Sequence, residues 1–250
     1  MKSFIEELQD SIMRVAGGQR ISRIVIGVRC TYVELDDGGA GVVYTNREGE
    51  ISKSLPGRIV GMRVEEALNY LTSTRGLEIS LGLAVANALV NRSNPLFEER
   101  DAVREEELAQ SDVIVFIGYF PSYVKRLKNR VREIRVLEMQ NILSEEVEVS
   151  PWWSFSTVVR DATWLFITGA SISNHTINYI LPLSAHVKNK VVFGPSTPMI
   201  PDPFKRYNVR GLGGSIVVDR DLCYKIVSEG GGVRELLDSK CLKKVYLEIR

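Results

Sequence analysis

Short apolar runs and turn residues alternate along the second half of this chain. Three of the runs are Val113–Ile117, Trp164–Ile167 and Val191–Phe193, and each ends at or close to a glycine. They are too short for helices and rich in β-branched and aromatic residues, which is typical of buried strands. Helix-like sequence follows most of the turns. This strand–turn–helix rhythm predicts an α/β fold with a parallel sheet of the Rossmann type.

The first half has a different pattern. An alternating run over residues 24–35 predicts one strand, and residues 40–44 predict a second strand that returns as the other arm of a hairpin. Residues 79–91 carry no charged side chain, so we expect a buried helix there. The segment before residue 93 therefore predicts a smaller α+β unit.

The change in character falls in a charged segment. Residues 98–107 are dense in charge and follow a loop-like stretch, which is typical of a boundary. We predict an α+β domain over residues 1–92, a charged linker over 93–110 and a Rossmann-like domain over 111–250. The further elements expected in the second domain are strands at 134–137, 190–194 and 214–218, and helices near 121–130, 174–187 and 221–229.

The charge balance and the spacing of the cysteines indicate which classes of binding partner and which cellular compartment to expect. The chain has 32 basic and 31 acidic residues and no long basic block, which argues against nucleic acid or an anionic membrane as the main partner. The charge-free stretch 162–187 is interrupted by polar residues and a proline, so we interpret it as buried sheet, loop and helix. Cys30, Cys223 and Cys241 are widely spaced, and we expect thiols in a reducing cytoplasm.

Candidate ligand-binding residues follow the predicted strands. Parallel strands bring their C-terminal ends to one edge of a sheet, and ligands bind outside that edge. Asn87 of the buried helix is expected to face this edge from the first domain. The residues expected to form the site are Asn87, Gly118, Tyr119, Glu138, Thr168, Gly169, Asn174, Thr176, Pro195, Ser196 and Gly213.

The first turn of the Rossmann-like domain is unlike a dinucleotide-binding turn. A fingerprint needs G-x-G-x-x-G, whereas Gly118 is followed by Tyr119, Phe120 and Pro121, so we do not expect NAD to bind. Glu138 nevertheless lies where ribose-binding acids occur. It could hold ribose hydroxyls, another ligand or a cation, or it could be a solvated acid at a strand end.

For several other polar residues, the sequence allows both a structural and a ligand-binding role. Asn174 or Thr176 could cap the next helix instead of binding a ligand. His175 is one of two histidines and the only candidate base. Ser196 lies outside any G-x-S-x-G motif, so a hydroxyl that hydrogen-bonds a ligand is more plausible than a nucleophile.

The sequence contains few residues in patterns that are typical of metal ligands. The chain has no H-x-x-x-H motif and no Cys/His cluster, so soft-metal sites lack obvious ligands. Carboxylates such as Glu138 suit a harder cation. The cofactor is therefore unknown, and a metal ion stays open.

Taken together, these segments resemble the "putative heavy-metal chelation" family of two-domain proteins. The resemblance implies an N-terminal domain like that of enolase, a Rossmann-like C-terminal domain and a site in the cleft between them. It also implies chelation of a heavy metal or handling of a related small molecule. The segments that carry it are Ser80–Leu89, Ile117–Pro121, Glu138, Thr168–Gly169, Asn174–Thr176, Gly194–Ser196 and Gly213–Gly214.

Three functions follow as hypotheses. The first is a protein that handles a metal or a metal chelate in the interdomain cleft. The second is an enzyme that acts on a small anionic or nucleotide-like substrate, and the third is a binding module without catalysis. In each case the partner is a small molecule or metal complex, and a homo-oligomer stays open.

Overall fold

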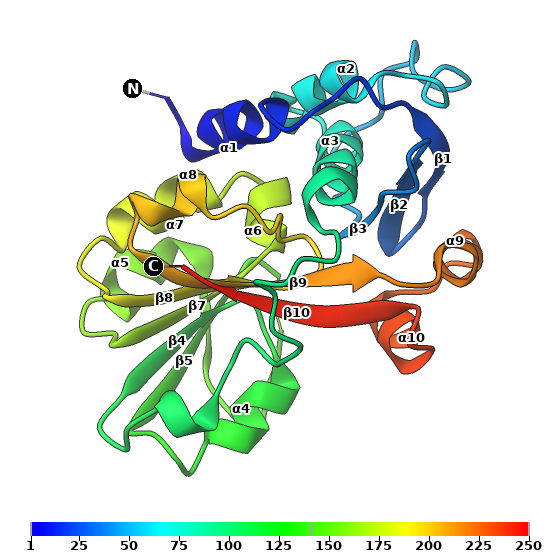
Figure 1. The fold of residues 1–250 in the computed structure, drawn as a ribbon. Helices are drawn as coiled ribbons and strands as arrows, with labels where there is room; N and C mark the ends of the chain where they lie inside the picture. The colour runs from blue at the N-terminus through cyan, green and yellow to red at the C-terminus, as the bar shows by residue number, and fades with distance from the viewer. Residues whose placement is uncertain (1, 141, 250) are drawn as a thin grey trace.

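The computed structural model describes residues 2–140 and 142–249, which form two sheets (Figure 1). The small sheet is antiparallel and contains β1 (Ile21–Ile26), β2 (Cys30–Leu35) and β3 (Ala40–Tyr44). The large sheet contains β4 (Val113–Ile117), β5 (Glu133–Glu138), β6 (Val149–Pro151), β7 (Trp164–Thr168), β8 (Asn189–Phe193), β9 (Val209–Val217) and β10 (Leu242–Glu248).

Short helices connect and cover these strands. The α-helices are α1 (Phe4–Met13), α2 (Val64–Leu68), α3 (Gly76–Val90), α4 (Pro121–Leu127), α5 (Phe155–Val158), α6 (Ala170–Ser173), α7 (Ile177–Leu183), α8 (Asp202–Lys205), α9 (Arg220–Ser228) and α10 (Val233–Asp238). The 3-10 turns are η1 (Asn69–Thr72), η2 (Glu105–Glu107) and η3 (Trp152–Ser154). Among the described residues, every helix is too short or too polar to traverse a lipid bilayer.

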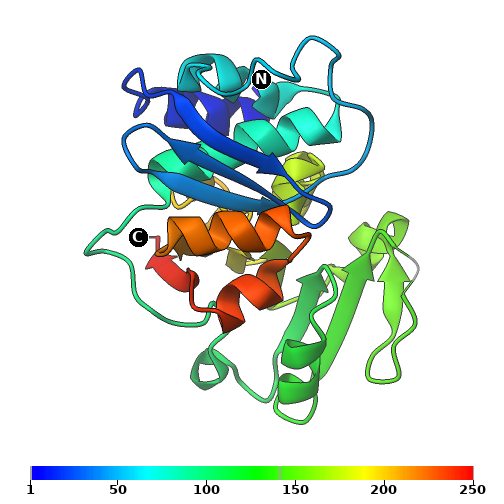
Figure 2. The same ribbon diagram turned by 90° about the vertical axis from the view of Figure 1, so that its right-hand side faces the viewer.

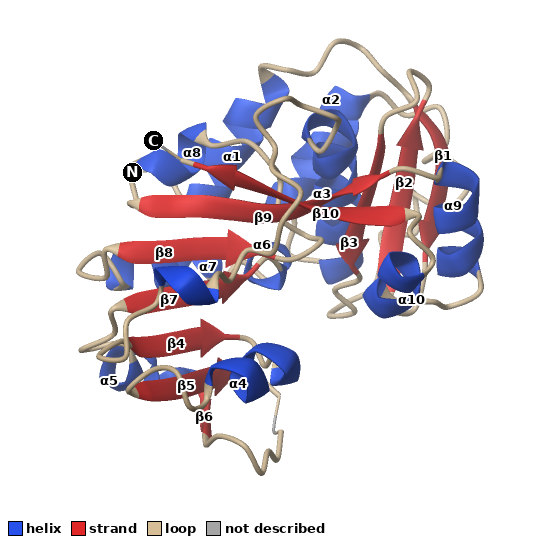
Figure 3. Ribbon diagram, turned by 60° about the horizontal axis from the view of Figure 1, so that its bottom comes forward, coloured by secondary structure: helices blue, strands red, loops and turns tan. Residues whose placement is uncertain are grey.

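The large sheet has the order β10-β9-β8-β7-β4-β5-β6 (Figure 3). All neighbouring pairs from β9 to β6 are parallel, and β10 pairs antiparallel with β9 at the edge. The prediction of a mainly parallel sheet is therefore confirmed. The chain passes from β4 outward to β5 and β6 and then returns to the other side of β4, so the order reverses between β4 and β7.

Alternating side chains of the central strands enter two different cores. Val115 and Leu165 pack with α1, α7 and α8 on one face of the sheet. Phe116 and Phe166 face the opposite side, where they pack with α4 and stack at a ring separation of 5.2 Å. Both faces of these strands are thus covered, which explains why their sequences are continuously apolar.

The small sheet is covered by helices from both halves of the chain. α3 packs on one face, and α9, from the C-terminal part, contacts β1 and β2 on the other (Figure 2). Residues 24–35 were expected to form one strand, but they form β1 and β2 with a turn at 27–29. The turn is possible because Gly27 approaches the carbonyl of Cys30 so closely that a Cβ atom there would lie 2.7 Å from that oxygen.

Two further differences concern the second half. The helix expected over 174–187 is shorter and corresponds to α7 alone, because His175 before it adopts a left-handed conformation with φ of 60° and separates it from α6. The strands β6 and β10 were not predicted, and the expected strand 214–218 is the end of the longer strand β9.

The buried helix expected over residues 79–91 is confirmed as α3. Its two asparagines bind backbone groups of the Rossmann-like half. Asn87 donates to the carbonyls of Val42 and Pro195 at 3.1 and 2.8 Å. Asn91 donates to Thr197 and Ser215 and accepts a 2.8 Å hydrogen bond from the amide of Met199. These amides fix α3 against the loop that follows β8.

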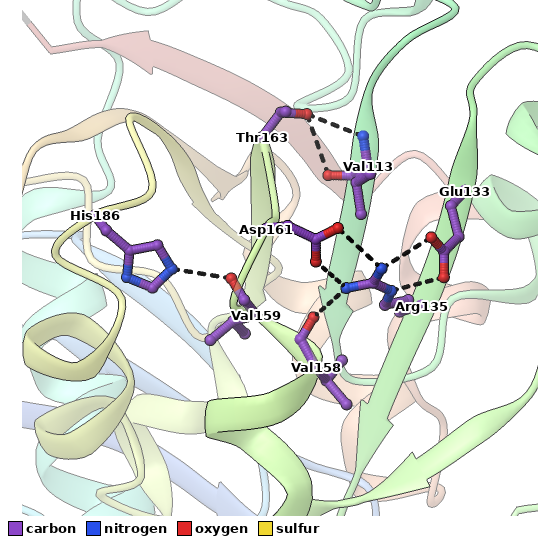
Figure 4. Close-up of polar contacts among 8 residues, drawn as sticks. All are labelled: Val113, Glu133, Arg135, Val158, Val159, Asp161, Thr163 and His186. Atoms are coloured by element: carbon purple, nitrogen blue, oxygen red, sulfur yellow. Dashed lines mark hydrogen bonds and ion pairs between the residues drawn. The ribbon is translucent and has the colours of Figure 1, made fainter.

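A charged cluster fastens α5 beside the parallel sheet (Figure 4). The guanidinium of Arg135 binds Glu133 at 2.7 Å, Asp161 at 2.6 Å and the carbonyl of Val158 at 2.8 Å. The two carboxylates raise the pKa of Arg135 further above its ordinary value. This cluster holds the β5–β7 connection in place.

The charged segment before β4 lies against the sheet. The backbone of Glu98 exchanges two 2.8 Å hydrogen bonds with Tyr246 of β10, and the guanidinium of Arg100 covers the Tyr246 ring. The division into residues 1–92, 93–110 and 111–250 stays a prediction.

We predict that Asn91→Ala lowers the free energy of unfolding by about 3 kcal/mol, because it leaves buried backbone groups without partners. Asn69→Ala is the matched control, since Asn69 is exposed and its side chain accepts a hydrogen bond from Gln9. That change should cost about 0.5 kcal/mol or less. Urea denaturation measures both, and equal losses would contradict the role of Asn91.

Candidate functional site

A cavity of about 780 Å³ lies outside the C-terminal ends of β4, β5 and β7. Gly118 follows β4 and Thr168 ends β7, and the strand order reverses between these two strands. Both residues line the cavity. Open α/β sheets bind ligands at such a switch point. The volume lies within the range of pockets that hold small organic molecules.

The first wall is the turn after β4. Gly118 has φ of +98°, and a Cβ atom there would lie 3.2 Å from the side chain of Thr168. Phe120 turns inward and packs on Phe193, with ring centroids 4.5 Å apart. The hydroxyl of Tyr119 instead meets that of Ser144 at 2.8 Å. The aromatic residues thus shape the turn, and the expectation that NAD does not bind stays a prediction.

Glu138 is held in place at the end of β5. One carboxylate oxygen accepts a 3.1 Å hydrogen bond from the amide of Tyr119. The other accepts from the amides of Met139 and Gln140 at 2.7 and 3.3 Å. These three amide hydrogen bonds fix the orientation of the carboxylate. Its remaining lone pairs can accept hydroxyl or amine donors of a ligand.

The junction of α6 and α7 forms another wall of the cavity. The side-chain oxygen of Asn174 accepts hydrogen bonds from the amide and hydroxyl of Thr176 at 3.1 and 2.7 Å, and its nitrogen lies 3.2 Å from the sulfur of Met139. The Thr168 hydroxyl accepts from the amide of Ala170 at 3.3 Å. Asn174 therefore shapes the local turn and also lines the cavity.

The small sheet supplies the wall opposite. Asn46 donates to the carbonyl of Ser173 at 2.8 Å and thereby holds the segment after β3 beside α6. Its neighbours Thr45 and Arg47 line the cavity. The Thr45 hydroxyl binds the carbonyl of Gly27 at 2.8 Å, which brings the β1–β2 turn, with Arg29, to the same edge.

The start of α10 completes the enclosure. Gly232 approaches Arg29 so closely that a Cβ atom would lie 3.1 Å from its Cδ. The carboxylate of Glu235 accepts from the amide of Gly232 at 2.9 Å and lies 3.5 Å from the guanidinium of Arg29. These contacts lower the pKa of Glu235, with the backbone hydrogen bonds as the main cause.

The charged residues of the lining are mainly basic. Arg29, Arg47 and Arg234 stand against Glu138 and Glu235. Glu235 is engaged with Arg29 and with the backbone, and Glu138 is engaged with three amides. The surplus of guanidinium groups favours anions in the cavity.

His175 does not belong to the cavity lining. Its Nε2 atom lies 2.8 Å from the carbonyl of Leu71, so the ring joins the α6–α7 junction to η1. Burial lowers its pKa below the ordinary histidine value, and the hydrogen bond to Leu71 opposes this only in part. The ring therefore serves as a neutral contact between the two halves.

The structure brings six of the expected site residues to this cavity and places five elsewhere. The six are Gly118, Tyr119, Glu138, Thr168, Asn174 and Thr176. Asn87 and Ser196 instead bind backbone groups, the latter accepting from the amide of Tyr44 at 2.9 Å. Gly169 packs against Thr197, and Pro195 and Gly213 line a separate cavity of about 60 Å³. Buried polar side chains need partners, and the backbone of the other half supplies one to the amide nitrogen of Asn87 and one to the hydroxyl of Ser196.

Several lining residues were not expected from the sequence. Val28, Arg29, Thr45 and Arg47 come from the small sheet, and Trp152 follows β6. The segment 232–235 at the start of α10 also lines the cavity. Its position depends on the packing of α10 against α9 and β10, for which the local sequence contains no signal.

The donor set does not fit a heavy-metal ion bound directly by the protein. Within residues 2–140 and 142–249, no group of three or more His, Cys, Asp and Glu side chains converges in a way that could hold one. Glu138 is the carboxylate at the strand edge, and its neighbours there are amides and hydroxyls.

Sheet order and cavity position define a protein with a large, mostly parallel Rossmann-like sheet, a smaller antiparallel sheet and a cavity at the switch point. Residues 101–246 and 5–90 match two sequence families that share the description "Putative heavy-metal chelation". The chain belongs to this family.

Solved structures and a sequence relative agree with this assignment. A protein of unknown function from Desulfitobacterium hafniense superposes with a TM-score of 0.83 at 21% identity, covering 98% of both chains. One from Pyrococcus horikoshii gives 0.82 at 19% identity, covering 98% of this chain and 100% of that chain. An uncharacterised protein of Methanocaldococcus jannaschii is 26% identical over 167 residues, which span 65% of this chain and 63% of the relative.

We predict a pH dependence that His175 causes. Its pKa is lowered in the folded state, so the unfolded chain binds the proton more readily. The neutral ring thus contributes stability above the ordinary histidine pKa of about 6.5, and this contribution is lost as the pH falls below it. His175→Gln should reduce the loss of unfolding free energy between pH 7 and pH 5, measured by urea denaturation. His186→Gln is the control and should keep the wild-type loss. An unchanged loss in the His175 variant would refute the assignment.

Proposed function

We propose that the protein binds an anionic small molecule in the cavity at the switch point. The observation that carries this proposal is the meeting of Gly118 and Thr168 with three arginines around one cavity of about 780 Å³. The strand ends supply the position, and the guanidinium groups supply the charge preference. The lining residues come from both halves of the chain, which supports a site between them as the family resemblance implies.

The chemistry of the lining suggests how such a molecule is held. Guanidinium groups of Arg29, Arg47 and Arg234 bind carboxylate or phosphate oxygens through paired N–H donors. Glu138 accepts hydroxyl or amine donors, and Trp152 offers an apolar surface. A ligand with an acidic group at one end and hydroxyl groups at the other suits this arrangement.

A metal enters this proposal as part of the ligand. Because the donor set does not suit a directly bound heavy-metal ion, a metal would arrive already complexed by an organic chelator. Anionic chelates carry the carboxylate or phosphonate groups that arginines recognise. Catalysis stays an open alternative, and a cytoplasmic location stays a prediction from the sequence.

Native mass spectrometry combined with elemental analysis tests this directly. The protein is purified without chelators and examined for a bound mass, and the released material is then analysed for metals. Retention of an acidic organic molecule, with or without a metal, supports the proposal. A metal ion retained alone, without any organic component, contradicts it.

We predict that Arg47→Gln weakens anion binding by about tenfold, because a charge-assisted hydrogen bond contributes about 1.5–3 kcal/mol. Citrate, adenosine monophosphate and inorganic phosphate serve as probes, and titration calorimetry measures their affinity. Arg58→Gln is the matched control, since Arg58 is exposed and lies outside the cavity lining. The proposal fails if none of the probes binds more tightly to wild type than to the Arg47 variant. It also fails if the control loses as much affinity.

A further inference from the structure

Two cysteines that belong to no recognised sequence motif lie in contact in the core beside the small sheet. Cys223 lies in the first half of α9, and Cys241 directly precedes β10. Their sulfur atoms are 2.7 Å apart, and both residues are completely buried. The two side chains therefore point at each other within a closed apolar cluster.

The surrounding backbone holds both residues in this position. The carbonyl of Cys241 accepts hydrogen bonds from the amides of Val218 and Asp219 at 2.9 and 3.3 Å. Asp219 caps α9 by accepting from the amide of Leu222 at 3.0 Å, and its own carbonyl binds the amide of Cys223 at 3.0 Å. The same turn thus fixes the backbone on both sides of the sulfur pair.

We propose that Cys223 and Cys241 form a disulfide that closes the segment containing α10. The oxidant belongs to the class of small-molecule or protein disulfides. One cysteine thiolate attacks that disulfide and forms a mixed disulfide, and one reduced thiol leaves. The second cysteine thiolate then displaces the other reduced thiol. The two cysteines lose two electrons and two protons in total, and the oxidant disulfide becomes two thiols.

Burial determines when the bond forms. Burial raises the pKa of Cys30 to about 12, and it also raises that of Cys223. The thiolate of Cys223 is therefore scarce in the folded protein, and thiolate is the reacting form. The disulfide therefore forms during folding, before α9 and α10 cover the pair. Once covered, it is shielded from reducing thiols, as buried structural disulfides are.

The crosslink has a consequence for the candidate site. Gly232 and Glu235 lie between the two cysteines in sequence and form one wall of the cavity. Closing the loop restricts the unfolded and locally opened chain more than the native state. The disulfide therefore holds the α10 wall in place even when the rest of the C-terminal segment opens.

The test begins with protein refolded from urea in reduced and oxidised glutathione. The refolded protein is denatured, alkylated with N-ethylmaleimide and measured by intact mass. We expect one alkyl group, on Cys30, and three after prior treatment with dithiothreitol. Peptide mapping should yield one linked peptide pair that joins Cys223 to Cys241.

Thermal unfolding gives a second readout. The oxidised protein should melt about 5–10 °C above the reduced protein, as expected for a loop of this size in a chain of this length. Cys223→Ala and Cys241→Ala should each abolish the difference between oxidised and reduced protein. Cys30→Ala is the matched control, since Cys30 is equally buried in the same cluster, and it should retain the difference.

Three results would overturn the proposal. The first is three alkylated cysteines after oxidative refolding of the wild type, and the second is a disulfide that includes Cys30. The third is a thiol pair that resists alkylation because it holds a metal ion, which native mass spectrometry detects as a mass lost on treatment with a chelator. The wild-type measurements decide these points even if an alanine variant fails to fold.

Discussion

The arrangement of the two units depends on polar groups that the apolar helix α3 carries into the core. Burying an amide costs free energy unless it finds hydrogen-bond partners. Asn91 finds its partners in the loop after β8 and in β9, and Asn87 binds that loop as well as Val42 of β3. α3 therefore reaches low free energy only when the Rossmann-like half is docked at one register. That register also sets the distance between the small sheet and the ends of β4 and β7. The cavity between them follows from this packing.

The fold of this chain is shared by proteins whose sequences differ from it at most positions. Two solved structures share the fold over nearly the whole chain at 21% and 19% identity. At such low identity, the sheet order and close backbone contacts preserve the fold rather than particular side chains. Gly41 is one such contact, because a Cβ atom there would lie 2.3 Å from a carbonyl of α3. In this chain the cavity lies outside the ends of the parallel strands, and its basic charges come from Arg29, Arg47 and Arg234.

The parallel sheet and the residues at the ends of its strands could be predicted from the sequence. Runs of apolar residues, and the glycines that end them, are local signals that a short stretch of sequence contains. The prediction missed β10, whose exposed Lys243 and Lys244 interrupt the apolar pattern of an edge strand. It also missed Arg29 and Arg47, since exposed arginines look like ordinary solvated surface until the fold gathers them. Asn87 and Ser196 show the opposite case. A buried polar residue needs a partner, but sequence alone does not distinguish a ligand from the chain's own backbone.

The position of α9 on the small sheet affects how the protein is made in the cell. The ribosome releases residues 21–44 early, yet the helix that covers one face of their sheet is encoded more than 170 residues later. Until then, Tyr32 and Val42, which are buried in the finished protein, have no cover from that helix. Exposed apolar sheet of this kind attracts other chains and chaperones. The N-terminal unit thus cannot complete its packing until α9 has been synthesised.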